Sequence, residues 1–189
     1  EEQSLKGTFR LAVLPTIAPY LLPRFFQQLS EKHTDLDIRM LEMKTAPTMA
    51  ALQNGEIDAA IIANQPTESN LQGDILYYEQ FFGYVAHNES IFKKDLIRTA
   101  DINDERLWLL DEGHCFRDQL MRFCQMEKVK VRQAAYRLGS LETFMRMVES
   151  GNGITFIPEL ATLQLSKEQK NWYVVRHSQA DTGDRLCHP

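Results

Sequence analysis

The sequence lacks an excess of basic residues, a long apolar run and an export signal, and each absence excludes a class of protein. The 189 residues include 21 Lys and Arg against 26 Asp and Glu, for a formal net charge of -5. Binding to a nucleic-acid backbone depends on clustered Lys and Arg, so we expect no DNA binding by this chain alone. No apolar run approaches the roughly 18 residues of a membrane span, and the start shows no signal-peptide pattern. We therefore expect a soluble, intracellular chain in the cytoplasm.

Cysteine and the usual catalytic motifs are also scarce. The chain has three cysteines, at Cys115, Cys124 and Cys187. In a reducing compartment such thiols form transient rather than structural disulfides. The sequence contains no nucleophile elbow and no Gly-rich phosphate loop, so we expect no cofactor.

The sequence does contain an alternation of predicted strands and helices. Strands are predicted at 8–14, 36–41 and 57–62, and helices at 19–32 and from about Pro47 to Gly55. Short, apolar strands separated by helices are typical of a parallel sheet. The pattern therefore predicts an α/β lobe.

A second series of elements begins near Leu76. A helix is expected between a cap at Ser140 and a terminator at Gly151, with Glu142 in its first turn. The other elements that we predict are a β-rich aromatic stretch at 77–86, strands at 108–110, 136–138 and 154–158, and a helix at 116–124.

These patterns predict two lobes that share one chain. The boundary is expected where the second series of strands begins, near Leu76. The divisions that we predict are the end of a linker at 1–7, lobe I at 8–76, lobe II at 77–178 and a tail at 179–189.

Cys115 is the candidate reactive group. It follows a predicted strand and begins a predicted helix, so backbone N–H groups and the positive end of the helix dipole would face its sulfur. Arg117 can add positive charge that stabilises the thiolate, whereas Asp118 would oppose it if close. His114 is a candidate hydrogen-bond donor or an ordinary turn residue. The alternative for Cys115 is a buried, inert small hydrophobe.

The second thiol, Cys124, lies nine residues further on. A helix would separate the two Cα atoms by roughly 13 Å, whereas a disulfide needs about 7 Å or less. If these thiols join, the helix between them must break, and a partner could detect that refolding. Taken alone, Cys124 is more typical of a helix core. A zinc site of His114, Cys115 and Cys124 is the metal alternative, but it lacks a fourth ligand and the usual spacings.

Thr16 and Thr45 both lie where a predicted strand gives way to a helix. In α/β lobes, groups at these positions commonly bind ligands. Helix capping is the alternative for each residue.

The residues from Gly113 to Gln119, followed by Phe123 and Cys124, resemble the sensing segment of the peroxide-sensing regulators of the LysR family. Other segments agree, and the similarity spans roughly 7–175. The segments that carry it are Leu14-Pro15-Thr16, 19–23, 139–143, Met147-Val148 and 151–155.

The resemblance implies a fold, a partner and a role for each candidate residue. The fold would be two periplasmic-binding-protein-like, Rossmann-like α/β lobes, that is, a type 2 LysR effector-binding domain. The regulatory domains would form a homodimer within a full-length tetramer, and DNA would be bound only by an N-terminal winged helix-turn-helix domain. Cys115 would be the peroxide-reactive thiol and Cys124 its disulfide partner. Thr16, Thr45 and His114 would surround the sulfur and hydrogen-bond hydrogen peroxide.

Two other functions stay open at this point. A thiol peroxidase would consume peroxide repeatedly with a thiol reductant. A LysR-type domain for a small organic effector would be stabilised by that metabolite. The sequence favours a non-enzymatic sensor over both.

The tail departs from the family pattern. Relatives continue with a segment like Pro-x-Arg-x-Ile followed by apolar residues. Suitable codons for Ala180 to Pro189, read one base later, encode Pro-Thr-Arg-Glu-Ile-Val-Phe-Val-Ile, which matches that segment. We therefore expect a frameshifted end, in which Cys187 is accidental and the family's peroxide-site arginine is missing. Sequencing the encoding DNA would test this.

Overall fold

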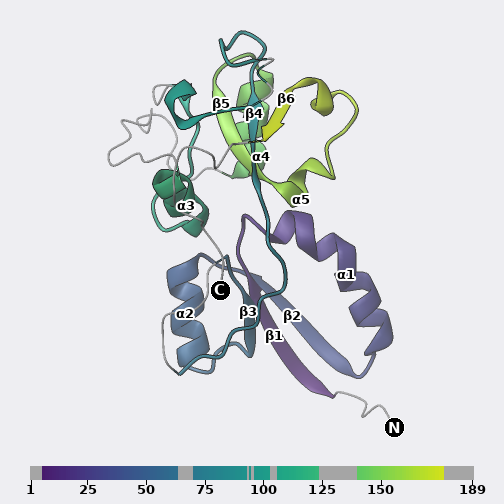
Figure 1. Cartoon of the computed structure of the whole chain (residues 1–189). Helices are drawn as coiled ribbons and strands as arrows, with labels where there is room; N and C mark the ends of the chain where they lie inside the picture. The colour runs from purple at the N-terminus through teal and green to yellow at the C-terminus, as the bar shows by residue number, and fades with distance from the viewer. Residues whose placement is uncertain are drawn as a thin grey trace. The chain divides into compact units, whose positions relative to one another are not determined.

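The computed structural model describes residues 6–63, 70–92, 94, 96–102, 106–123 and 140–176. The chain divides into two compact units, which are described separately (Figure 1). Unit 1 consists of Glu1–Tyr78 and Glu112–Asp118, and unit 2 consists of Glu79–Asp111 and Gln119–Pro189. The sequence predicts that all of 77–178 belongs to the second lobe, whereas the segment that begins α3 (Cys115–Phe123) groups with unit 1. Cys124, the predicted strand at 136–138 and the tail at 179–189 lie outside the described residues.

Unit 1 is built on a parallel sheet of three strands in the order β2-β1-β3. The strands are β1 (Gly7–Val13), β2 (Leu36–Glu42) and β3 (Ala59–Ile61), and β1 pairs in parallel with both others. Parallel neighbours need crossover connections. Helices α1 (Ala18–Lys32) and α2 (Thr45–Gln53) supply them and flank the sheet (Figure 1). The predicted α/β lobe is confirmed.

Neither Thr16 nor Thr45 occupies a helix N-cap. Helix α2 begins at Thr45 itself, and Lys44, in extended conformation, occupies the N-cap. Pro47 suits the first turn of a helix that starts at Thr45, because the N–H groups of the first turn have no partner within the helix. The N-cap of α1 is Ile17, which makes no side-chain capping bond, so Thr16 caps nothing either. The capping alternative is therefore wrong for both residues.

Unit 2 contains an antiparallel sheet in the order β5-β4-β6. Its strands are β4 (Phe81–Val85), β5 (Ile154–Pro158) and β6 (Tyr173–Arg176). Strand β5 lies where it was predicted and is buried throughout. Strand β4 is shorter than the predicted stretch at 77–86, and β6 was not predicted. The predicted strand at 108–110 is wrong, because the described pairing there is a single bridge between Leu107 and Ile154.

Helix α4 (Leu141–Glu149) matches its prediction closely. The Ser140 hydroxyl accepts a hydrogen bond from the Thr143 N–H at 3.1 Å, which is an N-cap contact. Gly151 follows the helix with a φ of 100°, a conformation that glycine adopts without strain. One face of α4 packs into the core of unit 2 with the spacing of an amphipathic helix. Its buried residues are Leu141, Phe144, Met145 and Val148.

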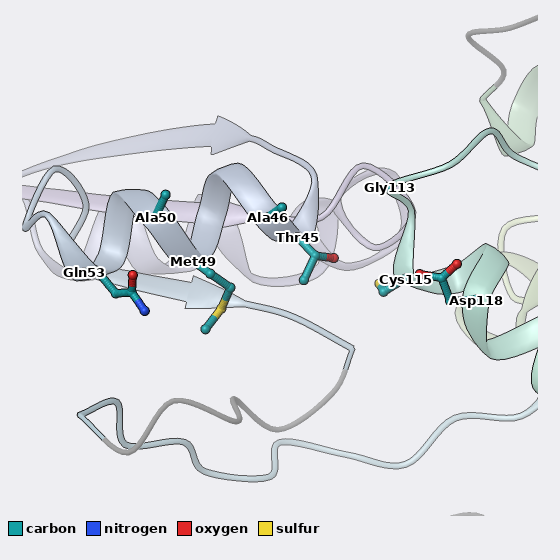
Figure 2. A pocket seen from close by; sticks show the side chains of 8 residues that line it. All are labelled: Thr45, Ala46, Met49, Ala50, Gln53, Gly113, Cys115 and Asp118. Atoms are coloured by element: carbon teal, nitrogen blue, oxygen red, sulfur yellow. The ribbon is translucent and has the colours of Figure 1, made fainter.

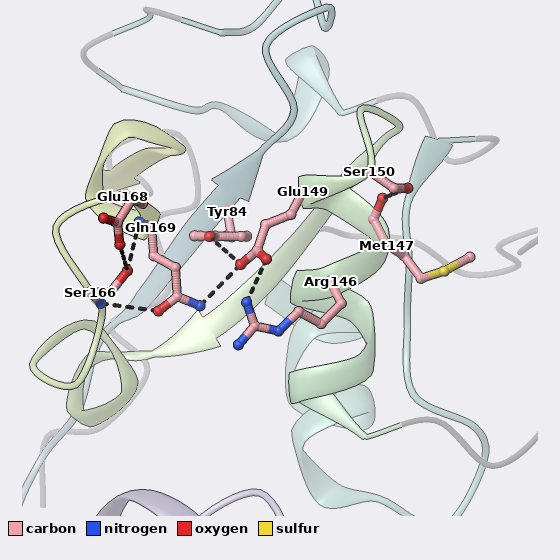
Figure 3. Close-up of polar contacts among 8 residues, drawn as sticks. All are labelled: Tyr84, Arg146, Met147, Glu149, Ser150, Ser166, Glu168 and Gln169. Carbon is pink, nitrogen blue, oxygen red and sulfur yellow. Dashed lines mark hydrogen bonds and ion pairs between the residues drawn. The ribbon is translucent and has the colours of Figure 1, made fainter.

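A largely buried carboxylate joins three elements of unit 2 (Figure 3). Glu149, at the end of α4, accepts hydrogen bonds from the Tyr84 hydroxyl at 2.9 Å and the Gln169 amide at 3.0 Å. Arg146 lies 2.6 Å from its other oxygen. Burial alone would raise the pKa of Glu149, but these three donors hold it below its ordinary value. The pKa of Tyr84 is raised by burial and by the same carboxylate.

The remaining described elements are short or lie next to the site. Helix α3 (Cys115–Phe123) begins one residue before its prediction, with Phe116 and Leu120 buried. The others are α5 (Glu159–Thr162) and the 3-10 helices η1 (Thr99–Asp101) and η3 (Gln169–Asn171). Within the described ranges, no helix is long and apolar enough to cross a membrane.

Candidate functional site

The carboxyl edge of the unit 1 sheet is where its connections leave in different directions. The chain passes from β1 through α1 to β2 on one side of β1, whereas β3 lies on the other side. A strand order that reverses in this way creates a switch point, where open α/β sheets usually bind ligands. The fold alone therefore predicts a site beside the carboxyl ends of β1 and β3.

Cys115 lies at this edge. Its side chain belongs to a buried cluster with Val13 and Leu14, at the end of β1, and with Ile17 and Ala18, at the start of α1. It is 7% exposed and is a free thiol. The sulfur is thus held by the first strand and its following loop.

Backbone groups fix the position of the thiol at the start of α3. The carbonyl of His114 accepts hydrogen bonds from the N–H groups of Arg117 at 3.0 Å and Asp118 at 3.3 Å, which begins the helix. His114 and Arg117 are both 8% exposed. The sequence predicts that Cys115 lies between a strand and a helix. The helix is present, but no strand precedes it, since 108–110 has no regular structure.

A lysine joins this loop to the start of α2. The Lys44 ammonium donates a hydrogen bond to the Glu112 carbonyl at 3.3 Å. A cationic donor strengthens such a bond relative to a neutral one. The contact holds the segment that carries the thiol against the N-terminus of α2.

The environment of the thiol raises its pKa. Burial is the largest cause, and the Asp118 carboxylate acts in the same direction. The Thr45 hydroxyl and the backbone groups of Phe116 and Ala63 lower it, but by less. The sequence predicts that the helix start favours the thiolate. That effect is present but is outweighed, because removing a charged sulfur from water costs more than these few dipoles return.

The Thr45 hydroxyl is the unusual polar group of this site. Its Oγ1 is buried, and it is the one such side-chain oxygen or nitrogen in the described part of the chain that has no hydrogen-bond partner. It nevertheless lies near enough to lower the pKa of Cys115. The hydroxyl therefore faces the sulfur without a hydrogen bond of ordinary geometry. Leaving a buried hydroxyl unpaired costs about 1 to 3 kcal/mol, so a bound molecule that pairs with it would recover that cost.

A hollow of about 510 Å³ adjoins both groups (Figure 2). Thr45 and Cys115 lie at one end of it, and Met49 and Gln53 lie further along α2. All of its lining belongs to unit 1. The lining residues are Thr45, Ala46, Met49, Ala50, Gln53, Gly113, Cys115 and Asp118.

The other predicted site residues are placed less directly. Thr16 is 5% exposed in the turn between β1 and α1, beside residues that pack against Cys115. His114 and Arg117 lie within two residues of the thiol in sequence and are buried. Cys124 lies outside the described residues, so the thiol pair and the zinc alternative that includes it stay predictions. Among the residues that the structure describes, no group of three or more potential ligands could hold a metal ion.

Comparison with known proteins places this geometry in a family. The model of the LysR substrate binding domain matches residues 2–177. The chain belongs to that family. Within it, a crystal structure of an OxyR mutant from Porphyromonas gingivalis is 54% identical, with a TM-score of 0.83 over 89% of this chain and 77% of that one. The two periplasmic-binding-protein-like α/β lobes expected from the resemblance are thereby confirmed as the fold class.

Curated relatives carry related names. A probable hydrogen peroxide-inducible genes activator from Mycobacterium leprae is 34% identical over 85% of this chain and 52% of its own length. The DNA-binding transcriptional dual regulator OxyR from Escherichia coli is 31% identical over 84% of this chain and 52% of its own length. The chain therefore spans about half the length of the curated relatives it matches. Within the LysR family the chain is similar to OxyR regulatory domains, as the resemblance indicated.

Sequence reasoning missed one wall of the hollow. Ala46, Met49, Ala50 and Gln53 lie at positions i, i+3, i+4 and i+7 of α2 and share one face of it. That spacing was visible in the sequence. It does not indicate a site by itself, because small apolar residues on a short helix usually belong to the core.

Proposed function

We propose that this chain is the redox-sensing regulatory domain of a cytoplasmic, LysR-type transcription factor, in which hydrogen peroxide oxidises Cys115. The observation that supports the proposal best is the pairing of a free thiol with a buried, unpartnered hydroxyl at Thr45 beside a hollow. Such a hydroxyl can hydrogen-bond a peroxide oxygen next to the sulfur. The names of the relatives agree with this chemistry.

The first step is a two-electron oxidation of the thiol. The sulfur attacks one oxygen of hydrogen peroxide, the O–O bond breaks, and the other oxygen leaves as water once it takes up the thiol proton. Because the pKa of Cys115 is raised, little thiolate is present at neutral pH. The rate therefore depends on how well the site positions peroxide and moves that proton, a task for Thr45 and, by resemblance, for Thr16 and His114.

The second step couples oxidation to conformation. The sulfenic acid of Cys115 condenses with the Cys124 thiol, which forms a disulfide and releases water. Helix α3 begins at Cys115, and a helix over nine residues would hold the two Cα atoms roughly 13 Å apart. Disulfide formation must therefore unwind it. Phe116 and Leu120 are 5% and 2% exposed. Exposing each side chain would cost about 1.5 to 3 kcal/mol of burial free energy unless it is buried again elsewhere.

The conformational change would be transmitted through the assembly of the full-length protein. A homodimer of regulatory domains within a full-length tetramer would transmit the unwinding to N-terminal winged helix-turn-helix domains, which bind DNA. Reburial of Phe116 and Leu120 at the subunit interface would offset the cost of unwinding. The domain acts as a switch rather than as an enzyme, because each molecule is oxidised once per signal.

Hydrogen exchange before and after peroxide tests this function. Oxidised protein should show a Cys115–Cys124 disulfide by mass and loss of protection confined mainly to 112–123 and its neighbours. The Cys124→Ser variant, treated identically, should keep the reduced pattern. A disulfide confirmed by mass with unchanged exchange would contradict the switch.

A further inference from the structure

The turn that leads to Cys115 contacts two parts of one lysine side chain. The Lys44 ammonium donates a hydrogen bond to the Glu112 carbonyl at 3.3 Å. The stem of the same lysine lies beside Gly113, because its Cδ is 3.6 Å from the place that a Cβ on this glycine would take. Lysine often packs its stem against the protein while its ammonium bonds elsewhere. Lys44 therefore holds two consecutive residues of the turn.

This turn directs the chain into α3. Gly113 has a φ of 87°, a conformation that residues with a Cβ rarely adopt. The next residue, His114, supplies the carbonyl that accepts the first hydrogen bonds of the helix, from the N–H groups of Arg117 and Asp118. A side chain that fixes the turn at 112–113 therefore also fixes the first turn of α3, which carries the sulfur.

Lys44 is itself well placed to act as an anchor. It is the N-cap residue of α2, with an extended backbone, and its neighbour Thr45 faces the sulfur. The two residues thus hold the turn and the thiol from the same end of α2 (Figure 2). Within α3, Cys115–Asp118 group with unit 1, whereas the residues that follow group with unit 2. The lysine acts on the part of α3 that belongs to unit 1.

We infer that Lys44 is a positioning residue that stabilises the reduced conformation and so sets the equilibrium between the thiols and the Cys115–Cys124 disulfide. The inference rests on the proposed function and deepens its regulation. Unwinding of α3 releases the His114 carbonyl and the turn before it, so the bond from Lys44 is lost in the disulfide form. An interaction made in only one of two states shifts their equilibrium by its own free energy. Removal of the lysine donor should therefore favour the disulfide.

The test measures this equilibrium for the full chain in buffers of reduced and oxidised dithiothreitol. The two protein thiols give two electrons and two protons to oxidised dithiothreitol, which becomes the dithiol as the Cys115–Cys124 bond forms. A Cys187→Ser background prevents exchange with the third thiol, and mass spectrometry quantifies the linked peptide. Lys44→Met keeps most of the stem and removes the donor. It should raise the equilibrium constant for the disulfide about fivefold, the value of one hydrogen bond.

Two further variants separate the hydrogen bond from the loss of a charge. Lys44→Arg keeps a cationic donor and should return the equilibrium constant to near its wild-type value. Lys6→Met removes the same charge from unit 1, together with an ion pair to Asp35 at 3.7 Å. Lys6 precedes β1, whereas the thiol packs at the other end of that strand. Lys6→Met should therefore leave the equilibrium unchanged.

Urea denaturation of both redox forms gives a second measurement. Lys44→Met should lower the free energy of unfolding of the reduced protein and leave that of the oxidised protein nearly unchanged. A lysine with a purely structural role would lower both values equally, and that result would overturn the inference.

The outcomes separate this inference from the proposed function. If the disulfide forms with the same equilibrium constant in the wild type and in Lys44→Met, or if Lys6→Met shifts the constant equally, the inference is wrong and the sensor stands. The same holds if Lys44→Arg behaves like Lys44→Met. Failure of the wild type to form a Cys115–Cys124 disulfide in every buffer would instead overturn the proposed function, and the inference with it.

Discussion

Each unit of this molecule buries a polar side-chain group, and the two are treated in opposite ways. In unit 2, the Glu149 carboxylate receives bonds from Tyr84, Gln169 and Arg146. In unit 1, the Thr45 hydroxyl is buried beside a free thiol and a hollow, and it has no hydrogen-bond partner of ordinary geometry within the protein. Both groups lie next to a sheet, and both would be costly if left unpaired.

The difference distinguishes a structural group from a functional one. A fully bonded buried group joins elements and rigidifies the fold. An unpaired one lowers stability, and a redox or catalytic role is one reason for it to persist. We therefore expect changes at Glu149 to lower stability without altering thiol chemistry, and changes at Thr45 to slow thiol chemistry without lowering stability.

The largest expected effect is on stability in unit 2. Glu149→Leu leaves the Tyr84 hydroxyl, in a side chain that is 0% exposed, without its acceptor. The free energy of unfolding should fall by about 2 to 4 kcal/mol, since unsatisfied buried groups cost about 1 to 3 kcal/mol each. Urea denaturation measures this.

A double variant is the control for that change. Adding Tyr84→Phe removes the hydroxyl that has lost its acceptor. Replacing both partners of a hydrogen bond by apolar groups can leave stability nearly unchanged. Stability should partly return, and the rate of Cys115 oxidation should match the wild type in both proteins. If Cys115 is oxidised more slowly in a folded Glu149→Leu variant, the separation between a structural role for Glu149 and a chemical role for unit 1 is wrong.

The next effect is on rate in unit 1. Thr45→Val keeps the shape of the side chain and removes only the unpaired hydroxyl. Oxidation of Cys115 by hydrogen peroxide should slow about tenfold, which corresponds to one hydrogen bond of about 1.4 kcal/mol lost from the transition state. The free energy of unfolding should not fall, and it should rise by up to about 1 to 3 kcal/mol, because the variant removes a buried hydroxyl that has no partner of ordinary geometry.

Thr48→Val is the matched control on the same helix. Thr48 is also buried, but its hydroxyl donates to the Met43 carbonyl at 3.4 Å. Its loss should lower stability by about 1 kcal/mol and leave the oxidation rate unchanged. If the two valine variants slow oxidation equally, Thr45 has no special part in the chemistry.

The smallest effect concerns the charge beside the thiol. Asp118 raises the pKa of Cys115, so Asp118→Asn should lower that pKa and move the midpoint of the pH–rate profile to lower pH. At neutral pH the rate should rise about two- to fourfold, a modest gain because Asp118 is exposed and its charge is screened. Glu112→Gln is the control in the same loop. An unchanged or raised midpoint in Asp118→Asn would contradict this assignment.

Much of unit 1 could be predicted because its signals are local. The strands of unit 1 and the helix beginning near Pro19 follow from short periodic patterns, and the Ser140 cap and Gly151 terminator of α4 in unit 2 follow from single residues. The strand expected at 108–110 failed because the apolar residues there serve the core, and the segment pairs with β5 only through the bridge between Leu107 and Ile154. Strand β6 was missed because its pairing with β4 joins distant segments.

The candidate site was only partly predictable for the same reason. Local sequence placed Cys115 at a helix start and marked Thr16 and Thr45 as strand-to-helix positions. It could not show that burial outweighs the helix dipole at the thiol, nor that the Thr45 hydroxyl lacks a partner. Both depend on how β1, α2 and α3 pack together.

Identification of the first oxidised residue tests the sensing role of unit 1 most directly. Protein with Cys124→Ser is given limiting hydrogen peroxide for a short time in the presence of a sulfenic-acid trap, and the labelled peptide is found by mass spectrometry. We predict that Cys115 carries the label, and that Thr45→Val in the same background delays it about tenfold. Preferential labelling of Cys187, or a Cys115 that stays reduced while free cysteine is oxidised, would contradict the proposed sensor.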